Sequence, residues 1–286
     1  MTVINGLQDI PELIQPNVHL RNEKEIISKI NQVIECGAKK LQIVTDFDYT
    51  LTRHTMDDGS SVLTSFGMFR ECPSIPQDYK EKDNRLAAYY KPIECDPVMS
   101  VEEKTQHMID WWAILVSLRR IKKRKQHHLP IRSGVRDLIS WSQKQQVPVL
   151  VFSAGLGECV LAALTAAGLL LPHVKVVSNF LAMDGQDVIT GIKGEVIHTY
   201  NKNETVIKNT DYYEMVKERN NVILMGDNIG DAGMADGMDH CDVVIKIGFL
   251  GHNAEGNLDN YLNKFDIVAV KDHTVDIANA ILKRVL

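Results

Sequence analysis

The strongest constraint on the fold is a short, mostly apolar run that ends in two acidic residues, Asp46 and Asp48. The run from Leu41 to Val44 is typical of a buried strand. Residues two positions apart on an extended chain point to the same side, so both carboxylates are expected to face one ligand. Carboxylates this close repel each other unless a cation or a shared proton lies between them. The sequence therefore predicts a buried strand with a metal ion, a shared proton, or both at its end.

Strand-like and helix-like patterns alternate along much of the chain. Helical spacing predicts an amphipathic helix over 20–38, before the acidic strand, and helical stretches around 79–90, 100–118 and 119–128. Residues 180–200 are typical of a β-hairpin. Further strands are expected at Val147–Phe152, Lys175–Ser178, Asn221–Met225, Val243–Ile247 and Ile267–Val270, with helices at 157–167 and 274–285. Repeated β–α units predict a parallel sheet with helices on both faces.

The alternation is interrupted after the acidic strand. Residues 53–78 are polar and rich in turn formers, and helical patterns follow to about residue 128. We therefore expect an α/β fold: a Rossmann-like parallel sheet flanked by helices, built from 1–55 and 130–286, with a mostly helical cap of 56–129 inserted after the first strand. Sheets of this kind bind ligands at the carboxyl ends of their strands, where the acids lie. An inserted cap can close over such a site and exclude water.

Composition excludes several classes of protein. The chain has 286 residues and a net charge of -5, which argues against general affinity for nucleic acid. A basic run at 119–125 is favoured as a solvated helix face, although it could also bind an anionic partner. The amino-terminal residues do not resemble a signal peptide, and the apolar runs are too short to span a bilayer.

The cysteines point to a reducing compartment. There are five, and none forms a C-x-x-C pair: they are Cys36, Cys72, Cys95, Cys159 and Cys241. An odd number of scattered cysteines is not typical of a disulfide framework or a zinc site. We expect a cytoplasmic protein.

Two further strand ends carry polar groups. Ser153 follows an apolar run and precedes Ala154 and Gly155, an arrangement that suits either an anion site or an ordinary helix cap. The pair Gly155 and Gly157 lacks the third glycine of a dinucleotide-binding motif. The strand that ends at Met225 is followed by the acidic residues Asp227 and Asp231.

Asp227 and Asp231 would be ordinary turn residues if they stood alone. If the sheet brings them to Asp46 and Asp48, they form an oxygen-ligand site that suits Mg²⁺, which shares its ligand shell with substrate phosphate. Lys202 follows the predicted hairpin and matters only if the fold brings it to these acids, where it would neutralise a phosphoryl group.

A calcium-binding loop is the rival interpretation of Asp46-x-Asp48-x-Thr50. An EF-hand loop needs glycine at its sixth position and glutamate at its twelfth. Those positions hold Leu51 and Asp57 in this chain, so the calcium interpretation is rejected.

Four ordered segments resemble the signatures of haloacid-dehalogenase-type phosphatases, namely Asp46-Phe47-Asp48-Tyr49-Thr50-Leu51-Thr52, Phe152-Ser153-Ala154-Gly155, Asn201-Lys202 and Gly226-Asp227-Asn228-Ile229-Gly230-Asp231. Longer segments resemble the cytosolic 5′-nucleotidase III (pyrimidine 5′-nucleotidase) family, among them Tyr89-Tyr90, Ile93-Glu94, Asp96-Pro97-Val98, Val101-Glu102-Glu103-Lys104, Lys175-Val176-Val177-Ser178-Asn179-Phe180, Lys193-Gly194-Glu195 and Met234-Ala235-Asp236-Gly237. The resemblance spans nearly the whole chain from about residue 22.

The resemblance implies Mg²⁺-dependent hydrolysis of nucleoside 5′-monophosphates. Asp46 would be the nucleophile that forms an aspartyl-phosphate, and Asp48 the general acid and base. The resemblance also implies which residues bind the metal and the phosphate. The metal would be held by Asp46, the Asp48 carbonyl and Asp227, and Asp231 would support these ligands. The phosphoryl oxygens would be held by Ser153, the Ala154 N–H and Lys202.

Base recognition is expected in the cap. By resemblance, Glu94 would accept hydrogen bonds from the base and Trp112 would stack on it, whereas Trp111 is interpreted as core. His54 stands where the family has an aromatic residue on the other face of the base, and Ile114-Leu115-Val116 replaces a family Lys-Ser-His segment. We expect activity on CMP, UMP and 7-methyl-GMP.

Three alternatives remain open. The chain could be a phosphomonoesterase acting on another small substrate, or it could transfer phosphate to an acceptor nucleoside. It could also be a non-catalytic protein that binds nucleotides or RNA ends through the 119–125 run. The main interpretation expects a monomer with a small-molecule substrate, no membrane association and no stable nucleic acid partner.

Overall fold

The computed structural model describes residues 2–71, 75–94, 96, 98–117, 129–185, 189–208, 210–238, 240–251 and 254–285. The basic run at 119–125, the helix expected over 119–128, Cys72 and Cys95 lie outside these residues.

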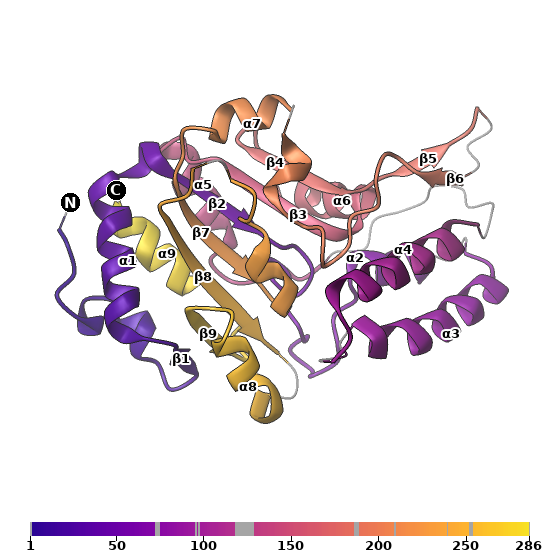
Figure 1. Cartoon of the computed structure of the whole chain (residues 1–286), viewed down its shortest axis with the longest axis horizontal. Coiled ribbons are helices and arrows are strands. Elements are labelled where there is room, and N and C mark those ends of the chain that lie inside the picture. Colours follow the sequence, from indigo (N-terminus) through magenta and orange to yellow (C-terminus); the bar gives the residue numbers. More distant parts are fainter. Residues whose placement is uncertain are drawn as a thin grey trace.

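A seven-stranded sheet forms the centre of the fold, with the order β1-β9-β8-β7-β2-β3-β4 (Figure 1). Neighbouring strands are parallel, except that β1 runs antiparallel to β9 at the edge. The strands of this sheet are β1 (Val18–Leu20), β2 (Leu41–Thr45), β3 (Val149–Leu156), β4 (Val174–Asn179), β7 (Asn221–Gly226), β8 (Val243–Leu250) and β9 (Ile267–Val270). A separate antiparallel hairpin pairs β5 (Leu181–Met183) with β6 (Ile189–Ile192), as predicted for 180–200.

Helices cover both faces of the sheet. The α-helices are α1 (Glu23–Cys36), α2 (Ser65–Arg70), α3 (Gln77–Glu94), α4 (Val101–Ser117), α5 (Val135–Lys144), α6 (Gly157–Ala166), α7 (Asp211–Val216), α8 (Ala254–Leu262) and α9 (Asp276–Val285). Short 3₁₀-helices lie at η1 (Leu7–Asp9), η2 (Pro11–Ile14), η3 (Ala38–Lys40), η4 (Glu204–Ile207) and η5 (Ile229–Gly233).

Side-chain alternation along the strands explains the two layers. In β2, Ile43 points into a core shared with α1, α5, α6 and α9, whereas Val44 points into a second core shared with α7 and η5. All five β2 residues are buried, as expected for a central parallel strand. The predicted α/β class and the two helical layers are confirmed.

One expectation about strand order needs correction. The chain's first strand is β1, which precedes α1, so the insertion follows the first strand of the parallel set rather than the first strand of the chain. β1 has only three residues, each half-buried at the sheet edge, and such a short segment gives no recognisable alternation.

The inserted segment, which we define as residues 53–130, leaves and re-enters the sheet domain at adjacent positions. Thr52 pairs with Ile131 in an antiparallel bridge, and the Arg53 N–H donates to the Pro130 carbonyl at 2.9 Å. Figure 1 shows α2, α3 and α4 of this segment together at one end of the molecule, near the β5–β6 hairpin. Ile75, Tyr79 and Trp112 share an apolar cluster with residues of β3, β5 and β6, so the segment is packed onto the rest of the fold.

The boundaries within the inserted segment were only partly predicted. The capping box before α4 is confirmed, because Ser100 and Glu103 exchange hydrogen bonds at 3.1 and 3.3 Å. The helix α2 was missed, since 53–78 was expected to be turn-rich. It has six residues, too few for a helical pattern, and is fixed by the Thr64 cap, whose hydroxyl accepts the Gly67 N–H at 3.0 Å.

None of the described helices has both the length and the apolar character that a bilayer-spanning helix requires.

Candidate active site at the carboxyl ends of three strands

The candidate site lies where the strand order reverses. β2 is flanked by β3 on one side and β7 on the other, and the later strands continue outward from each. Thr45, the last residue of β2, lies opposite Val151 and Met225, and the Asp46 N–H donates to the Met225 carbonyl at 2.9 Å. The crevice beyond such a reversal is the usual ligand site in open α/β sheets.

Lys202 reaches this point from a loop that follows the hairpin. Its ammonium lies 2.6 Å from Asp46 Oδ1 and 2.7 Å from Asp231 Oδ1, and all three side chains are buried. Burial by itself would lower the pKa of Lys202, but Asp231 and Asp46 outweigh burial and hold that pKa above its usual value. The side chain therefore carries a positive charge between two carboxylates, so the fold does bring Lys202 to the acids.

Three carboxylates form a cluster that suits a cation. Oxygens of Asp46, Asp227 and Asp231 all lie within 4.8 Å of one another. Among the described residues, no hydrogen-bond donor reaches the buried Asp46 Oδ2. A buried carboxylate oxygen without a partner is costly, and a hard divalent cation is the ligand that several carboxylates favour. The residues present thus fit a divalent metal.

The electrostatics of the cluster agree with this fit. Burial raises the pKa of Asp46 to about 7, with Asp231 and Asp48 adding to the rise and Lys202 opposing it. Burial, together with Asp46 and Asp231, also raises the pKa of Asp227 well above its usual value. Carboxylates in this state lack sufficient positive charge nearby, which a bound cation would supply.

Asp231 is already satisfied by the protein. Its Oδ1 accepts from Lys202, and its Oδ2 accepts the backbone N–H groups of Asp227 and Asn228 at 3.2 and 3.0 Å. These bonds orient the loop that carries Asp227, whose carbonyl also accepts the Tyr261 hydroxyl at 2.5 Å. Such contacts are typical of a residue that supports metal ligands rather than a ligand itself.

Asp48 faces the same crevice and is held by the inserted segment. The Ser65 N–H donates to Asp48 Oδ1 and the Ser65 hydroxyl donates to Oδ2, both at 2.6 Å. Burial raises the pKa of Asp48 to about 6, and the two Ser65 hydrogen bonds oppose this rise. The carboxyl group is therefore poised to exchange a proton near neutral pH.

The segment from Ser153 to Gly155 differs from the expected strand end and turn. The strand β3 continues to Leu156, with an irregular register between Phe152 and Leu156. Side chains of β4 maintain this irregular strand, because Ser178 donates to the Gly155 carbonyl at 3.0 Å and Asn179 donates to the Ala154 carbonyl at 2.9 Å. Ser153 itself is buried beside the crevice and accepts the Gly155 N–H at 3.1 Å.

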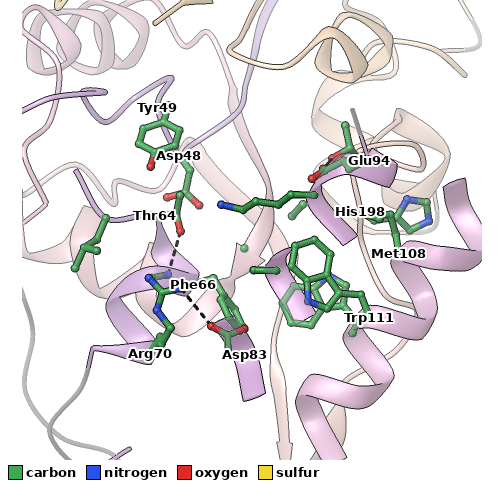
Figure 2. Close-up of a pocket in the computed structure, with 18 of the residues that line it drawn as sticks. Asp48, Tyr49, Thr64, Phe66, Arg70, Asp83, Glu94, Met108, Trp111 and His198 are labelled. Atoms are coloured by element: carbon green, nitrogen blue, oxygen red, sulfur yellow. Dashed lines mark hydrogen bonds and ion pairs between the residues drawn. The ribbon is translucent and has the colours of Figure 1, made fainter. Parts of the chain in front are cut away.

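A pocket of about 400 Å³ extends from Asp48 into the inserted segment. Figure 2 shows Asp48 and Tyr49 on one side of this pocket and Glu94 with Trp111 on the other. Ala154 and Gly155 line it next to Asp48, and Trp112 lines it within the inserted segment. The pocket thus joins the acidic site to an aromatic wall.

The two tryptophans have different surroundings. Trp112 is 9% exposed and packs edge-on against Phe66 with ring centroids 5.7 Å apart. Trp111 stacks on Tyr90 at 5.5 Å with an interplanar angle of 11°. Trp112, expected to stack on a base, is thus also a core residue, and Trp111, expected to be core, also reaches the pocket wall.

His54 is not among the residues that line this pocket. Its ring lies 4.8 Å from the Tyr49 ring, and it packs so closely on Gly251 that a Cβ there would lie 1.9 Å from the imidazole. Tyr49 lines the pocket, and its hydroxyl donates to the Val62 carbonyl at 2.9 Å. The described structure therefore presents Tyr49, not His54, to the pocket.

Glu94 ends α3 and lies against the loop that carries Lys202. Its Oε1 accepts the Thr199 hydroxyl at 2.7 Å, and its carbonyl accepts the Tyr200 hydroxyl. These contacts fix the carboxylate of Glu94 on the pocket wall.

Sequence reasoning missed three supporting residues: Ser65, Tyr49 and Arg132. The buried Arg132 donates to the carbonyls of Tyr49 at 2.6 Å and Thr50 at 2.8 Å, and also to that of Asp272. It thereby holds the loop after Asp48, in which Tyr49 has a left-handed backbone with φ 60°. No local sequence pattern predicts these contacts, because Arg132 and Ser65 form hydrogen bonds with residues that are distant in the sequence.

Comparison with known proteins identifies relatives over nearly the full chain. The sequence profile described as pyrimidine 5′-nucleotidase (UMPH-1) matches residues 49–286. A Drosophila melanogaster protein named 7-methylguanosine phosphate-specific 5′-nucleotidase is 42% identical over 289 residues, covering 96% of this chain and 89% of that protein. The Homo sapiens protein of the same name is 30% identical and covers 98% of this chain and 96% of its own length.

Solved structures agree with these relationships. The crystal structure of cytosolic 5′-nucleotidase IIIB bound to cytidine matches with a TM-score of 0.91 and 40% identity, covering 99% of this chain and 98% of that chain. A haloacid-dehalogenase family hydrolase from Salmonella enterica matches with a TM-score of 0.51 and 11% identity, over 87% of this chain and 73% of that chain, which supports the fold alone. The chain therefore belongs to the pyrimidine 5′-nucleotidase family, whose members are hydrolases of the haloacid-dehalogenase fold.

Proposed function

We propose that this protein hydrolyses nucleoside 5′-monophosphates to nucleoside and inorganic phosphate, using Mg²⁺ and an aspartyl-phosphate intermediate. The observation that carries the proposal is the position of Asp48, which lies next to the pair of Asp46 and Lys202 and also lines a pocket with an aromatic wall. The acids and the lysine suit phosphoryl transfer, and the pocket suits a nucleoside.

The proposed roles are those that the family resemblance implies, and the positions and charges of these residues support them. An Asp46 oxygen attacks phosphorus, and the bond from phosphorus to the nucleoside 5′-oxygen breaks as Asp48 gives that oxygen a proton. Asp48 then takes a proton from water, whose oxygen attacks the phosphorus and releases Asp46. Lys202, Ser153 and the Ala154 N–H hold the phosphoryl oxygens throughout.

Asp46, the Asp48 carbonyl and Asp227 would hold Mg²⁺, with Asp231 orienting the loop. When bound, the ion offsets negative charge on the carboxylates and the phosphate, so that the two can approach. The cluster of Asp46, Asp227 and Asp231 and the unpaired Asp46 oxygen support this assignment.

Residues 56–129 are proposed to form the cap that selects the base. Glu94 would accept a hydrogen bond from the base, with Trp112 stacking on it. In this proposal His54 does not contact the base directly. It acts on substrate binding by packing against the ring of Tyr49. Two tryptophans and the carboxylate of Glu94 suit a cationic base such as 7-methylguanine as well as cytosine. The names of the relatives and the cytidine in the similar structure support both substrates.

A substrate panel tests the proposal. We expect turnover of CMP, UMP and 7-methyl-GMP above AMP, with all four rates lost when Mg²⁺ is removed. Hydrolysis of aryl phosphates without any nucleotide hydrolysis would favour a phosphomonoesterase with another substrate. Formation of labelled nucleotide from an added labelled nucleoside would reveal phosphotransfer.

Base-site variants separate a nucleotidase from a general phosphatase. We expect Glu94→Gln to reduce kcat/KM for CMP by about 10-fold or more, since a lost charge-assisted hydrogen bond costs about 1.5–3 kcal/mol. The same variant should leave hydrolysis of p-nitrophenyl phosphate nearly unchanged. Equal losses on both substrates would argue against base recognition by Glu94.

The protein is further proposed to act as a cytoplasmic monomer. The five scattered cysteines of the sequence, none of them in a C-x-x-C pair, support a reducing compartment. Light scattering of the purified protein would test the oligomeric state, with a mass near 32.2 kDa expected for a monomer.

A further inference from the structure

Ser65 binds the carboxylate of Asp48 with two groups at once. Its backbone N–H donates to Oδ1 and its hydroxyl donates to Oδ2, each at 2.6 Å. Ser65 has no exposed surface, so water does not compete for these bonds. A carboxylate held at both oxygens has a fixed plane and direction, which proton transfer to a bound substrate requires.

The surrounding structure makes room for this contact. Thr64 caps α2 and orients the first helical N–H groups, of which Ser65 supplies one. Gly155 lies against the pair, and a Cβ at that position would lie 1.8 Å from the Ser65 hydroxyl and 3.0 Å from Asp48 Oδ2. The helix α2 also packs on β3 and α6, so Ser65 is held from the inserted segment and the sheet domain together.

We propose that Ser65 is the positioning residue for the general acid and base, and that it couples docking of the inserted segment to catalysis. Asp48 belongs to the sheet domain, whereas Ser65 belongs to the segment that carries the nucleoside pocket. Asp48 is therefore aligned only when α2 is seated beside the phosphate site. The proposal rests on the proposed function, because it assumes that Asp48 transfers the proton.

The two Ser65 groups suit both states of Asp48. A backbone N–H only donates, so Oδ1 remains an acceptor, whereas a serine hydroxyl can donate or accept. Each oxygen of the Asp48 carboxylate therefore has a donor from Ser65, and the hydroxyl of Ser65 can also turn to accept a hydrogen bond. Replacing the hydroxyl leaves Oδ2 without its partner and frees the carboxyl group to rotate.

Comparing two leaving groups tests this role. A nucleoside 5′-oxygen leaves poorly without a proton, whereas p-nitrophenolate leaves readily without one, and kcat/KM for either substrate reports the first phosphoryl transfer. We expect Ser65→Ala to lower kcat/KM for CMP by about 10- to 100-fold, part of the contribution of a general acid. The loss with p-nitrophenyl phosphate should be less than about 3-fold.

Matched variants make the result specific. Ser60→Ala removes an exposed hydroxyl from the same inserted segment, outside the residues that line the pocket, and should leave both substrates unaffected. Ser65→Cys preserves the size of the side chain but donates weakly, so it should reproduce the Ser65→Ala pattern even if the alanine variant does not fold. Ser65→Thr retains the hydroxyl and should recover activity toward CMP.

Equal losses on both substrates, or no loss on either, would overturn the proposal. Failure of the proposed function is distinguishable, because it would appear as absent CMP turnover in the wild-type protein. In that case the same variants would be compared on an alkyl phosphate that the wild-type protein does hydrolyse, with the same pattern expected.

Discussion

The ammonium of Lys202 lies 2.6 Å from the Oδ1 atom of Asp46, although 156 positions separate the two residues in the chain. The pair is buried, and Asp231 accepts a second hydrogen bond from the same ammonium. The single positive charge of Lys202 is therefore shared by two carboxylates, in addition to its proposed contact with phosphate.

Removing this cation should cost stability as well as activity. We expect Lys202→Met to lower the free energy of unfolding by about 3–5 kcal/mol without Mg²⁺, because it leaves Asp46 and Asp231 buried without their partner. Urea unfolding measures the effect. Lys217→Met removes an exposed ion pair with Glu214 and serves as the control, with no measurable loss expected. Similar stabilities for the two variants would contradict the structural role of Lys202.

Divalent metal should stabilise the folded protein. We expect Mg²⁺ to raise the melting temperature, since a ligand at 100 times its Kd adds about 2.7 kcal/mol to stability. The shift should disappear in Asp227→Asn and persist in Asp236→Asn, which alters an exposed acid nearby. A shift that survives Asp227→Asn would place the metal elsewhere.

Variants of Trp112 and Trp111 should distinguish a role in core packing from a role in base binding. Trp112→Ala should lower the free energy of unfolding by about 3–5 kcal/mol, because it opens a cavity in the cluster around Phe66 and Leu156. Trp112→Phe should keep most of that stability but raise KM for CMP, through loss of stacking area. Trp111→Phe is the matched variant and should leave KM nearly unchanged. The reverse result would assign base stacking to Trp111.

Acidification should destabilise the protein through His173, which directly precedes β4 and so lies at the opposite end of the sheet from the candidate site. Burial lowers the pKa of His173, whose Nε2 lies 3.1 Å from the Ser142 hydroxyl. The unfolded chain thus binds this proton more tightly than the folded protein, so the contribution of His173 is complete above its unfolded pKa of about 6.5. The contribution is lost as pH falls from that value through the folded pKa.

Melting temperatures between pH 8 and pH 5 provide the test. His173→Gln should weaken the decline below pH 6.5 relative to the wild-type protein. A wild-type decline that is unchanged in this variant would exclude His173 as its source.

The chemistry of the site was more predictable than its supports. Asp46, Asp48 and Asp227 follow apolar strands directly, and strands of this kind end at one edge of a parallel sheet, so their proximity follows from local pattern and topology. Lys202 has no such signal, because a lysine in a loop gains meaning only from the fold or from a family resemblance.

Several features depended on packing that a sequence does not display. The helix α2 is too short for a periodic pattern, so Ser65 could not be placed opposite Asp48. Tyr49 rather than His54 lines the pocket, because the imidazole ring of His54 packs closely against Gly251 instead. Similarly, β1 owes its position to pairing with β9 at the far end of the chain.

The most direct test of the central claim is the rate of phosphate release from CMP by the wild-type protein and by Asp46→Asn, both with saturating Mg²⁺. If Asp46 is the nucleophile, the wild-type protein releases phosphate and the variant loses at least about 1,000-fold in kcat, as expected when a group acting in a concerted catalytic unit is removed. The variant should still bind CMP. Phosphate release by Asp46→Asn near the wild-type rate would contradict the account.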